Sequence, residues 1–158
     1  MRKRTIARVL AVVLGAALAL GALAGCQSPA TGATDQQQAN RTYMTKVNQA
    51  VEELNTRLGE FDEAVAQESV VNMRNKANSA FEAIDALAAI DTPDAMKDLQ
   101  TNYVDGCNKL KDALNSYIDL YTEISSATEE APFDFSAYDG RVKEIQDAYN
   151  EGIDKLKA

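Results

Sequence analysis

The sequence predicts an all-α fold, an up-and-down antiparallel helical bundle of three to four helices after an N-terminal apolar segment and a flexible tether. Apolar residues recur in steps of three and four through most of residues 39–158, which is the period of a helix and not of a strand. The opposite faces mix acidic and basic residues, as solvated helix surfaces do. Short links join the helical stretches and place neighbouring helices antiparallel.

The first helical stretch begins near residue 39. Its apolar residues alternate in steps of three and four without interruption, which forms a heptad seam. The seam consists of Met44, Val47, Val51, Leu54, Leu58, Phe61 and Val65. Gly59 lies beside this seam, where it costs about 1 kcal/mol of helix stability relative to Ala.

A second stretch with the same period follows without an intervening Pro or Gly. Its apolar positions are Val70, Met73, Ala77, Ala80, Ile84 and Leu87, with Phe81 and Ile90 beside them. One continuous helix over residues 40–90 would be about 75 Å long and would leave its apolar stripe uncovered. We therefore expect a turn at residues 66–69 that folds the second helix back onto the first.

The third stretch has a distinct start signal. Thr92 is a favourable N-cap, Pro93 suits the first helical position, and Asp94 adds an acid to the first turn. The helix should run for about 33 residues, or roughly 50 Å. Its seam is Met96, Leu99, Tyr103, Gly106, Leu110, Ala113, Tyr117, Leu120 and Ile124.

A polar loop over residues 125–136 separates the third stretch from the fourth. Asp134 or Ser136 can cap the fourth helix, and with Asp134 as the cap, Phe133 and Tyr138 stand at the positions of a hydrophobic staple. The apolar positions of this helix are Tyr138, Val142, Ile145, Tyr149, Ile153 and Leu156.

The N-terminal residues have the layout of an export signal. A basic start leads into an apolar run from residue 6 to residue 23, and two small residues, Ala24 and Gly25, follow it. A membrane-spanning helix is the competing interpretation. It needs about 20 apolar residues, and this run is slightly short and rich in Ala and Gly. The basic residues are Arg2, Lys3, Arg4 and Arg8.

The motif LAGC at residues 23–26 resembles the lipobox of bacterial lipoproteins, which ends a type II signal peptide. The resemblance implies that residues 1–25 are removed and that the thiol of Cys26 receives a diacylglycerol anchor. Two acyl chains hold a protein on a membrane far longer than one. The protein is then expected on the extracytoplasmic face of the cell membrane, with residues 26–38 as the lipidated Cys and its tether and 39–158 as the domain.

Acidic residues outnumber basic ones. The chain has a net charge of −8, and removal of residues 1–25, with four basic and no acidic residues, leaves 12 basic and 24 acidic residues, a net −12. Such a domain repels nucleic acid and anionic lipid headgroups. We therefore expect no nucleic-acid partner, and contact with the membrane through the lipid anchor alone.

The chemistry of the chain excludes several kinds of site. It has no His, and with Cys26 acylated its only free Cys is Cys107, so the usual zinc and haem sites and His-activated nucleophiles cannot form. The acidic runs at 60–63 and 129–134 lack the spacing of a calcium loop and are interpreted as solvated charge. We expect no catalytic residue, metal or cofactor, and we expect Cys107 in the core.

Five of the six tyrosines fall on the apolar stripes of the last two helices, and four of them could meet between these helices. They are interpreted as core residues, with an aromatic pocket between these helices as the alternative. No polar residue is expected to point inward from the regular seams. The four are Tyr117, Tyr121, Tyr138 and Tyr149.

Two functions remain open. Residues 39–158 resemble the small helical-bundle lipoproteins of bacterial surfaces, many of them of unassigned function. The regular seams, without inward polar residues, favour a non-catalytic interaction module that contacts another envelope protein or a cell-wall component, with Phe133 and Phe135 as the candidate contact. The alternative is a small-molecule carrier with an apolar cavity between its helices. The oligomeric state is left open.

Overall fold

The computed structural model describes residues 34–157, which form helices α2 (Asp35–Ala66), α3 (Val70–Ala88), α4 (Lys97–Ser126) and α5 (Tyr138–Leu156). A 3-10 turn, η1 (Asp94–Met96), precedes α4. No strand occurs in this part of the chain, so the predicted all-α bundle is confirmed. Residues 1–25, Cys26 and most of the tether lie outside the described residues.

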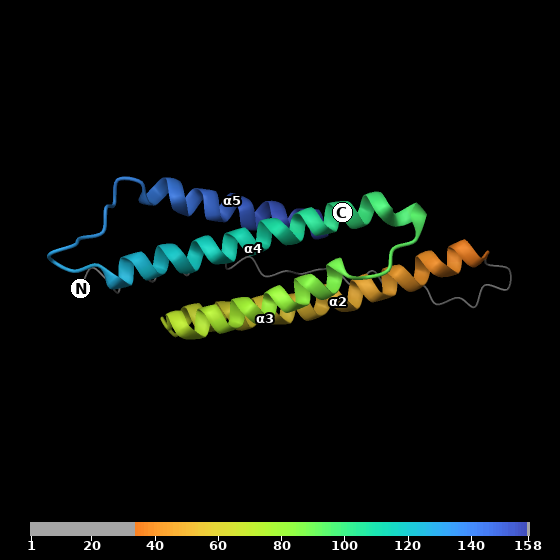
Figure 1. Cartoon of the computed structure of the whole chain (residues 1–158), viewed down its shortest axis with the longest axis horizontal. Helices are drawn as coiled ribbons and strands as arrows, with labels where there is room; N and C mark the ends of the chain where they lie inside the picture. The colour runs from red at the N-terminus through yellow and green to blue at the C-terminus, as the bar shows by residue number, and fades with distance from the viewer. Residues whose placement is uncertain (1–33, 158) are drawn as a thin grey trace.

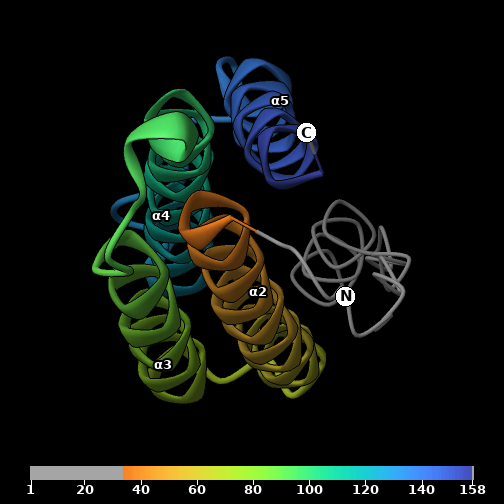
Figure 2. The same ribbon diagram turned by 90° about the vertical axis from the view of Figure 1, so that its right-hand side faces the viewer.

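Successive helices run antiparallel and pack in chain order, α2 on α3, α3 on α4 and α4 on α5 (Figures 1 and 2). The backbones of α2 and α5 scarcely approach each other. We call the end with Thr34 and the link 89–96 the base, and the end with the turn 66–69 and the loop 127–137 the tip. Figure 1 shows the tip loop beyond the end of α4, far from the start of α2.

The predicted seams form one continuous core. Six of the seven seam residues of α2 are buried, and the exception is half-buried Met44. Its place is taken by Tyr43, whose hydroxyl donates a 2.7 Å hydrogen bond to Oε1 of Gln100 in α4. Gln100 Nε2 in turn donates to the carbonyls of Leu87 and Ala88, so this one side chain joins α2, α3 and α4 at the base.

Helix α2 begins at Asp35, and therefore four residues of the predicted tether, 35–38, are helical. The cause is a capping box that the sequence analysis missed. Thr34 Oγ1 accepts from the Gln37 backbone N–H at 3.3 Å, and Gln37 Oε1 accepts from the Thr34 N–H at 3.1 Å. The boundary expected at residue 39 moves to residue 35.

The predicted turn at 66–69 is confirmed. Glu68 adopts a left-handed conformation with φ 56°, and the Ser69 hydroxyl accepts from the backbone N–H of Asn72 to cap α3. The Tyr121 hydroxyl of α4 donates to the Glu68 carbonyl at 3.3 Å, which ties this turn to the rest of the tip.

The predicted start of the third helix is wrong in detail. Thr92 does not cap it, because its hydroxyl donates to the Ile90 carbonyl at 2.9 Å. Pro93 precedes η1, where its carbonyl accepts from the Met96 N–H, and α4 begins only at Lys97. The 3-10 turn takes up the residues that the sequence pattern assigned to the first helical turn.

The predicted caps of the last helix are also wrong. Helix α5 follows Ala137 without a side-chain cap, and Asp134 instead accepts hydrogen bonds from the Ser136 N–H and hydroxyl within the loop. The expected contact between Phe133 and Tyr138 is nevertheless present, with ring centroids 6.4 Å apart.

Two glycines set the distance between α4 and α5. A Cβ on Gly106 would lie 2.9 Å from the Gly152 carbonyl oxygen, and one on Gly152 would lie 2.8 Å from that of Gly106. Only the absence of a side chain at both positions allows the two backbones to approach this closely. Gly106 stands on the predicted apolar seam, whereas Gly152 lies outside the predicted apolar positions of its helix.

Gly59 is the opposite case, because an added Cβ would meet no atom within 4 Å. We expect Gly59→Ala to raise the free energy of unfolding by about 1 kcal/mol, since Ala restricts the unfolded chain and favours the helix. Urea unfolding followed by circular dichroism measures this. A loss of stability would mean that α2 is not a regular helix at this residue.

Candidate functional site

The loop at the tip presents a small aromatic cluster. The rings of Phe133 and Phe135 meet edge to face with centroids 4.8 Å apart, and Phe135 lies 6.1 Å from Tyr138 of α5. Hydrogen bonds between Thr128 and Ala131 close the other half of the loop. Phe135 is nevertheless 53% exposed, so the loop leaves an apolar ring in contact with solvent.

A second exposed apolar residue lies at the same end. Val71, in the first turn of α3, is 70% exposed. Among residues 34–157, the exposed large apolar side chains are Val71 and Phe135, and both are at the tip. Scattered exposed apolar residues are ordinary, but their restriction to one end of a long bundle marks that end as the apolar surface.

The charge of the tip is acidic. Glu129, Glu130 and Asp134 are exposed in the loop. Hydrogen bonds from the backbone and hydroxyl of Ser136 hold the pKa of Asp134 below its usual value. Asp134 therefore keeps its negative charge at neutral pH, beside the exposed ring of Phe135.

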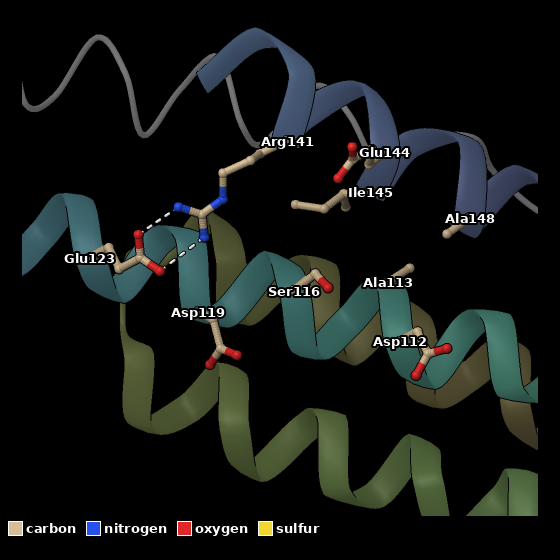
Figure 3. A pocket seen from close by; sticks show the side chains of 9 residues that line it. All are labelled: Asp112, Ala113, Ser116, Asp119, Glu123, Arg141, Glu144, Ile145 and Ala148. Carbon is tan, nitrogen blue, oxygen red and sulfur yellow. Dashed lines mark hydrogen bonds and ion pairs between the residues drawn. The ribbon is translucent and has the colours of Figure 1, made fainter. Parts of the chain in front are cut away.

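An open groove of about 370 Å³ lies between α4 and α5 (Figure 3). Its rim is polar and its floor is apolar, with Ile145 and two alanines between the charged side chains. Four of the lining residues are acidic and one is basic. The lining is Asp112, Ala113, Ser116, Asp119, Glu123, Arg141, Glu144, Ile145 and Ala148.

One ion pair spans the groove at the end nearest the tip. The Arg141 guanidinium donates to both carboxylate oxygens of Glu123, at 2.5 and 2.9 Å, as Figure 3 shows. This pair raises the pKa of Arg141 and lowers that of Glu123, chiefly through the hydrogen bonds. The positive charge of Arg141 is therefore offset locally, and the remaining field of the groove is negative.

A second groove, of about 340 Å³, lies at the base between the first turns of α2 and the link before η1. Lys46 and Asp91 contribute one charge of each sign to its lining. Small polar and apolar residues make up the rest, and this groove has no dominant charge.

The four tyrosines do not line the α4–α5 groove. Tyr117, Tyr121 and Tyr149 are buried in the core, and Tyr138 is half-buried at the start of α5. Tyr117 packs edge to face on Phe61 with centroids 5.8 Å apart. Their rings fill the space between helices where the alternative interpretation places a pocket.

Polar atoms do point inward, contrary to the expectation from the seams. The hydroxyls of Tyr117 and Tyr138 and Oδ1 of Asn55 are buried without a hydrogen-bond partner. Asp62 is half-buried, and burial raises the pKa of its carboxyl from 3.8 to about 6. The interpretation of residues 60–63 as solvated charge is thus wrong for Asp62, which turns toward the aromatic core.

Cys107 lies in the core, where burial raises the pKa of its thiol to about 11, so the thiol stays protonated at neutral pH. Between Thr34 and Lys157, no cluster of three His, Cys, Asp or Glu residues is placed to hold a metal ion. Within the same region, no helix combines the length and the apolarity that a membrane span requires.

The groove was not anticipated from the sequence, although a signal for it exists. Its polar residues on α4 follow one another in steps of four, three and four, beside the apolar seam. A second, acidic stripe at helical spacing next to a seam indicates a charged edge of a helix pair. Which other helix lies opposite this acidic stripe depends on tertiary packing alone. The residues are Asp112, Ser116, Asp119 and Glu123.

Comparison of the chain with protein-family models, with curated proteins and with solved structures finds no match.

Proposed function

We propose that this protein is a lipid-anchored, non-catalytic interaction module on the extracytoplasmic face of a bacterial cell membrane. Its lipobox Cys26 would attach it, and its tip loop with Phe133 and Phe135 would contact another envelope protein or a cell-wall component. The observation that carries the proposal is the exposed ring of Phe135 at the end of the bundle opposite to the start of α2.

The position of the anchor supports this arrangement. Cys26 precedes Thr34 by eight residues, and Thr34 lies at the base, where α2 begins. A chain of that length spans at most about 30 Å, so the base stays close to the bilayer. Helix α4 alone, with 30 residues, extends about 45 Å from base to tip. An anchored bundle can therefore present its tip well away from the lipid.

The interior gives less support to a carrier of small molecules. The tyrosines that would line such a cavity are packed into the core. The open groove between α4 and α5 has a charged rim in place of the enclosed apolar lining that a lipophilic ligand needs. We therefore favour the interaction module over the carrier of small molecules.

The anchor is tested by Cys26→Ala. Without the thiol no diacylglycerol can be attached, so we expect the protein to be lost from washed membranes or to remain as an uncleaved precursor. Cell fractionation and the mass of the mature protein distinguish the two. A Cys26→Ala protein that is still cleaved and still partitions with membranes would contradict the lipoprotein assignment.

The tip contact is tested by photo-crosslinking in the cells that make the protein. A photoreactive phenylalanine analogue at Phe135 should give one dominant crosslinked product, because the ring faces the partner. The same analogue at Glu82, an exposed position on α3, serves as the control. Equal and diffuse products at both positions would overturn the proposed contact.

A further inference from the structure

We propose that the tip loop and the acidic α4–α5 groove form one docking surface for a basic, Lys- or Arg-rich segment of an envelope protein. This inference rests on the proposed contact at the tip and names the chemistry of the partner. Three features carry it: the groove is continuous with the tip, its charge is predominantly negative, and its floor suits the stems of basic side chains.

The groove and the loop adjoin each other. Glu123 and Arg141, which form the end of the groove, stand within four residues of the ends of the loop, because α4 ends at Ser126 and α5 begins at Tyr138. A segment that covers Phe135 can therefore continue into the groove without leaving the surface of the α4–α5 pair.

Two of the four acids that line the groove lack a cationic partner in the described part of the chain. Asp112 and Glu144 form no ion pair within residues 34–157. The one basic residue of the lining, Arg141, is paired with Glu123. Arg74, on neighbouring α3, is paired in the same way with Asp119 at 3.4 Å. These two cations are thus engaged in ion pairs, and an incoming basic side chain meets a negative field.

The floor of the groove favours Lys and Arg over small cations. These side chains bury an aliphatic stem on apolar surface and keep the charged head at a polar rim. Ala113, Ile145 and Ala148 provide such a floor between the acidic residues. A metal ion or a free amine would use the rim alone and would leave the exposed ring of Phe135 unexplained.

Other macromolecules fit this surface poorly. Nucleic acid and anionic lipid are repelled by the acids of the groove and by Glu129, Glu130 and Asp134 of the loop. An apolar ring beside acidic groups instead matches a protein segment with an apolar residue next to several basic ones.

The test combines the crosslinker at Phe135 with charge reversal in the groove. The double variant Asp112→Lys/Glu144→Lys should lower the yield of the crosslinked product by on the order of tenfold, because two attractive charges become repulsive. The control Glu52→Lys/Glu82→Lys makes the same change of net charge on exposed residues of α2 and α3 and should leave the yield unchanged. Circular dichroism of both variants checks that they fold equally.

A second crosslinker, at Ser116 in the groove, identifies the segment. We expect it to capture the same protein as the crosslinker at Phe135, at a peptide rich in Lys or Arg, and less so as the salt concentration rises. The inference would be overturned if the captured peptide had no basic residues, or if the groove variant did not change the crosslinking yield at Phe135. Either result would leave the proposed contact at the tip unaffected. Absence of a specific product at Phe135 would overturn both proposals.

Discussion

Gly152→Ala is expected to lower the free energy of unfolding by roughly 2 kcal/mol, although Ala is the better helix former. The added Cβ would lie 2.8 Å from both the Gly106 carbonyl oxygen and Cγ of Leu110. The oxygen belongs to the backbone and cannot rotate away, so α4 and α5 must separate. Overpacking of this kind costs about 1–3 kcal/mol, which exceeds the gain of about 1 kcal/mol in helix propensity.

The same reasoning applies to Gly106→Ala, whose Cβ would lie 2.8 Å from Cβ of Lys155 and 2.9 Å from the Gly152 oxygen. Once either substitution has moved the helices apart, the second meets less resistance. We therefore expect the double variant to lose less stability than the sum of the two single variants.

Urea unfolding of the three variants measures these effects, with Gly59→Ala as the matched control. All are Gly→Ala changes within helices, but only Gly59 has free space around it. If Gly152→Ala stabilised the protein as much as Gly59→Ala does, the close approach of the α4 and α5 backbones would be refuted.

Asp62→Asn is expected to stabilise the protein at pH 7 and to stabilise it much less near pH 4.5. The carboxyl of Asp62 has no cation beside it, and burial raises its pKa to about 6. At neutral pH the folded protein must therefore hold an ionised carboxylate in a partly apolar setting. Asn keeps the shape of the side chain and removes the charge.

The sign of the pH dependence follows from linkage. Because the pKa of Asp62 is about 6 in the folded protein and near 3.8 in the unfolded chain, the folded state binds the proton first as the pH falls. Stability should thus rise between about pH 7 and pH 4, and the whole shift corresponds to at most about 3 kcal/mol. Since solvent reaches part of the carboxylate, we expect roughly 1–2 kcal/mol.

Neighbouring titratable groups do not obscure the pH dependence expected between about pH 7 and pH 4. The Tyr117 and Tyr149 hydroxyls interact with the charge of Asp62, but burial raises the pKa of both well above the acidic range. Carboxyls with lowered pKa values act in the opposite direction, and only at lower pH, where their hydrogen bonds and ion pairs are lost. They are Glu60, Asp94, Asp105, Glu123 and Asp134.

The measurement is urea unfolding at several pH values between 4.5 and 7.5, for the wild type and for Asp62→Asn. Glu63→Gln is the control, since it removes the same charge from the next, exposed residue. If the two variants had the same pH profile, the inward position of Asp62 would be refuted.

Much of the fold follows from periodicity. The heptad seam of α2 predicts its buried face almost residue by residue: Tyr43 is buried in place of Met44, and Ala64 is buried in addition. The turn at 66–69 was predicted because an uncovered apolar stripe is costly in water. Helix ends were predicted less well, since Thr92, Asp134 and Ser136 bond to nearby backbone or side-chain groups in place of the expected helix N–H groups.

The candidate site was predicted only in part. Phe133 and Phe135 were predicted as a surface contact because they are aromatic residues in a polar loop, and Phe135 is exposed. The groove beside them needs the relative rotation of α4 and α5. That rotation is set by the contact of Gly106 with Gly152, two residues 46 positions apart in the chain.

By itself, the sequence determined the helical class of this protein, the faces that most of its helices bury and the acidic character of its surface. These properties depend on spacing along the chain and on composition, which are local. Only the tertiary structure decided that Asp62 turns inward, that the tyrosines leave no pocket between α4 and α5, and that an acidic groove ends beside an aromatic loop at the tip. Each depends on which side chains from distant segments are brought together, because burial, close approach and electrostatic field are properties of packed neighbours and not of a single helix.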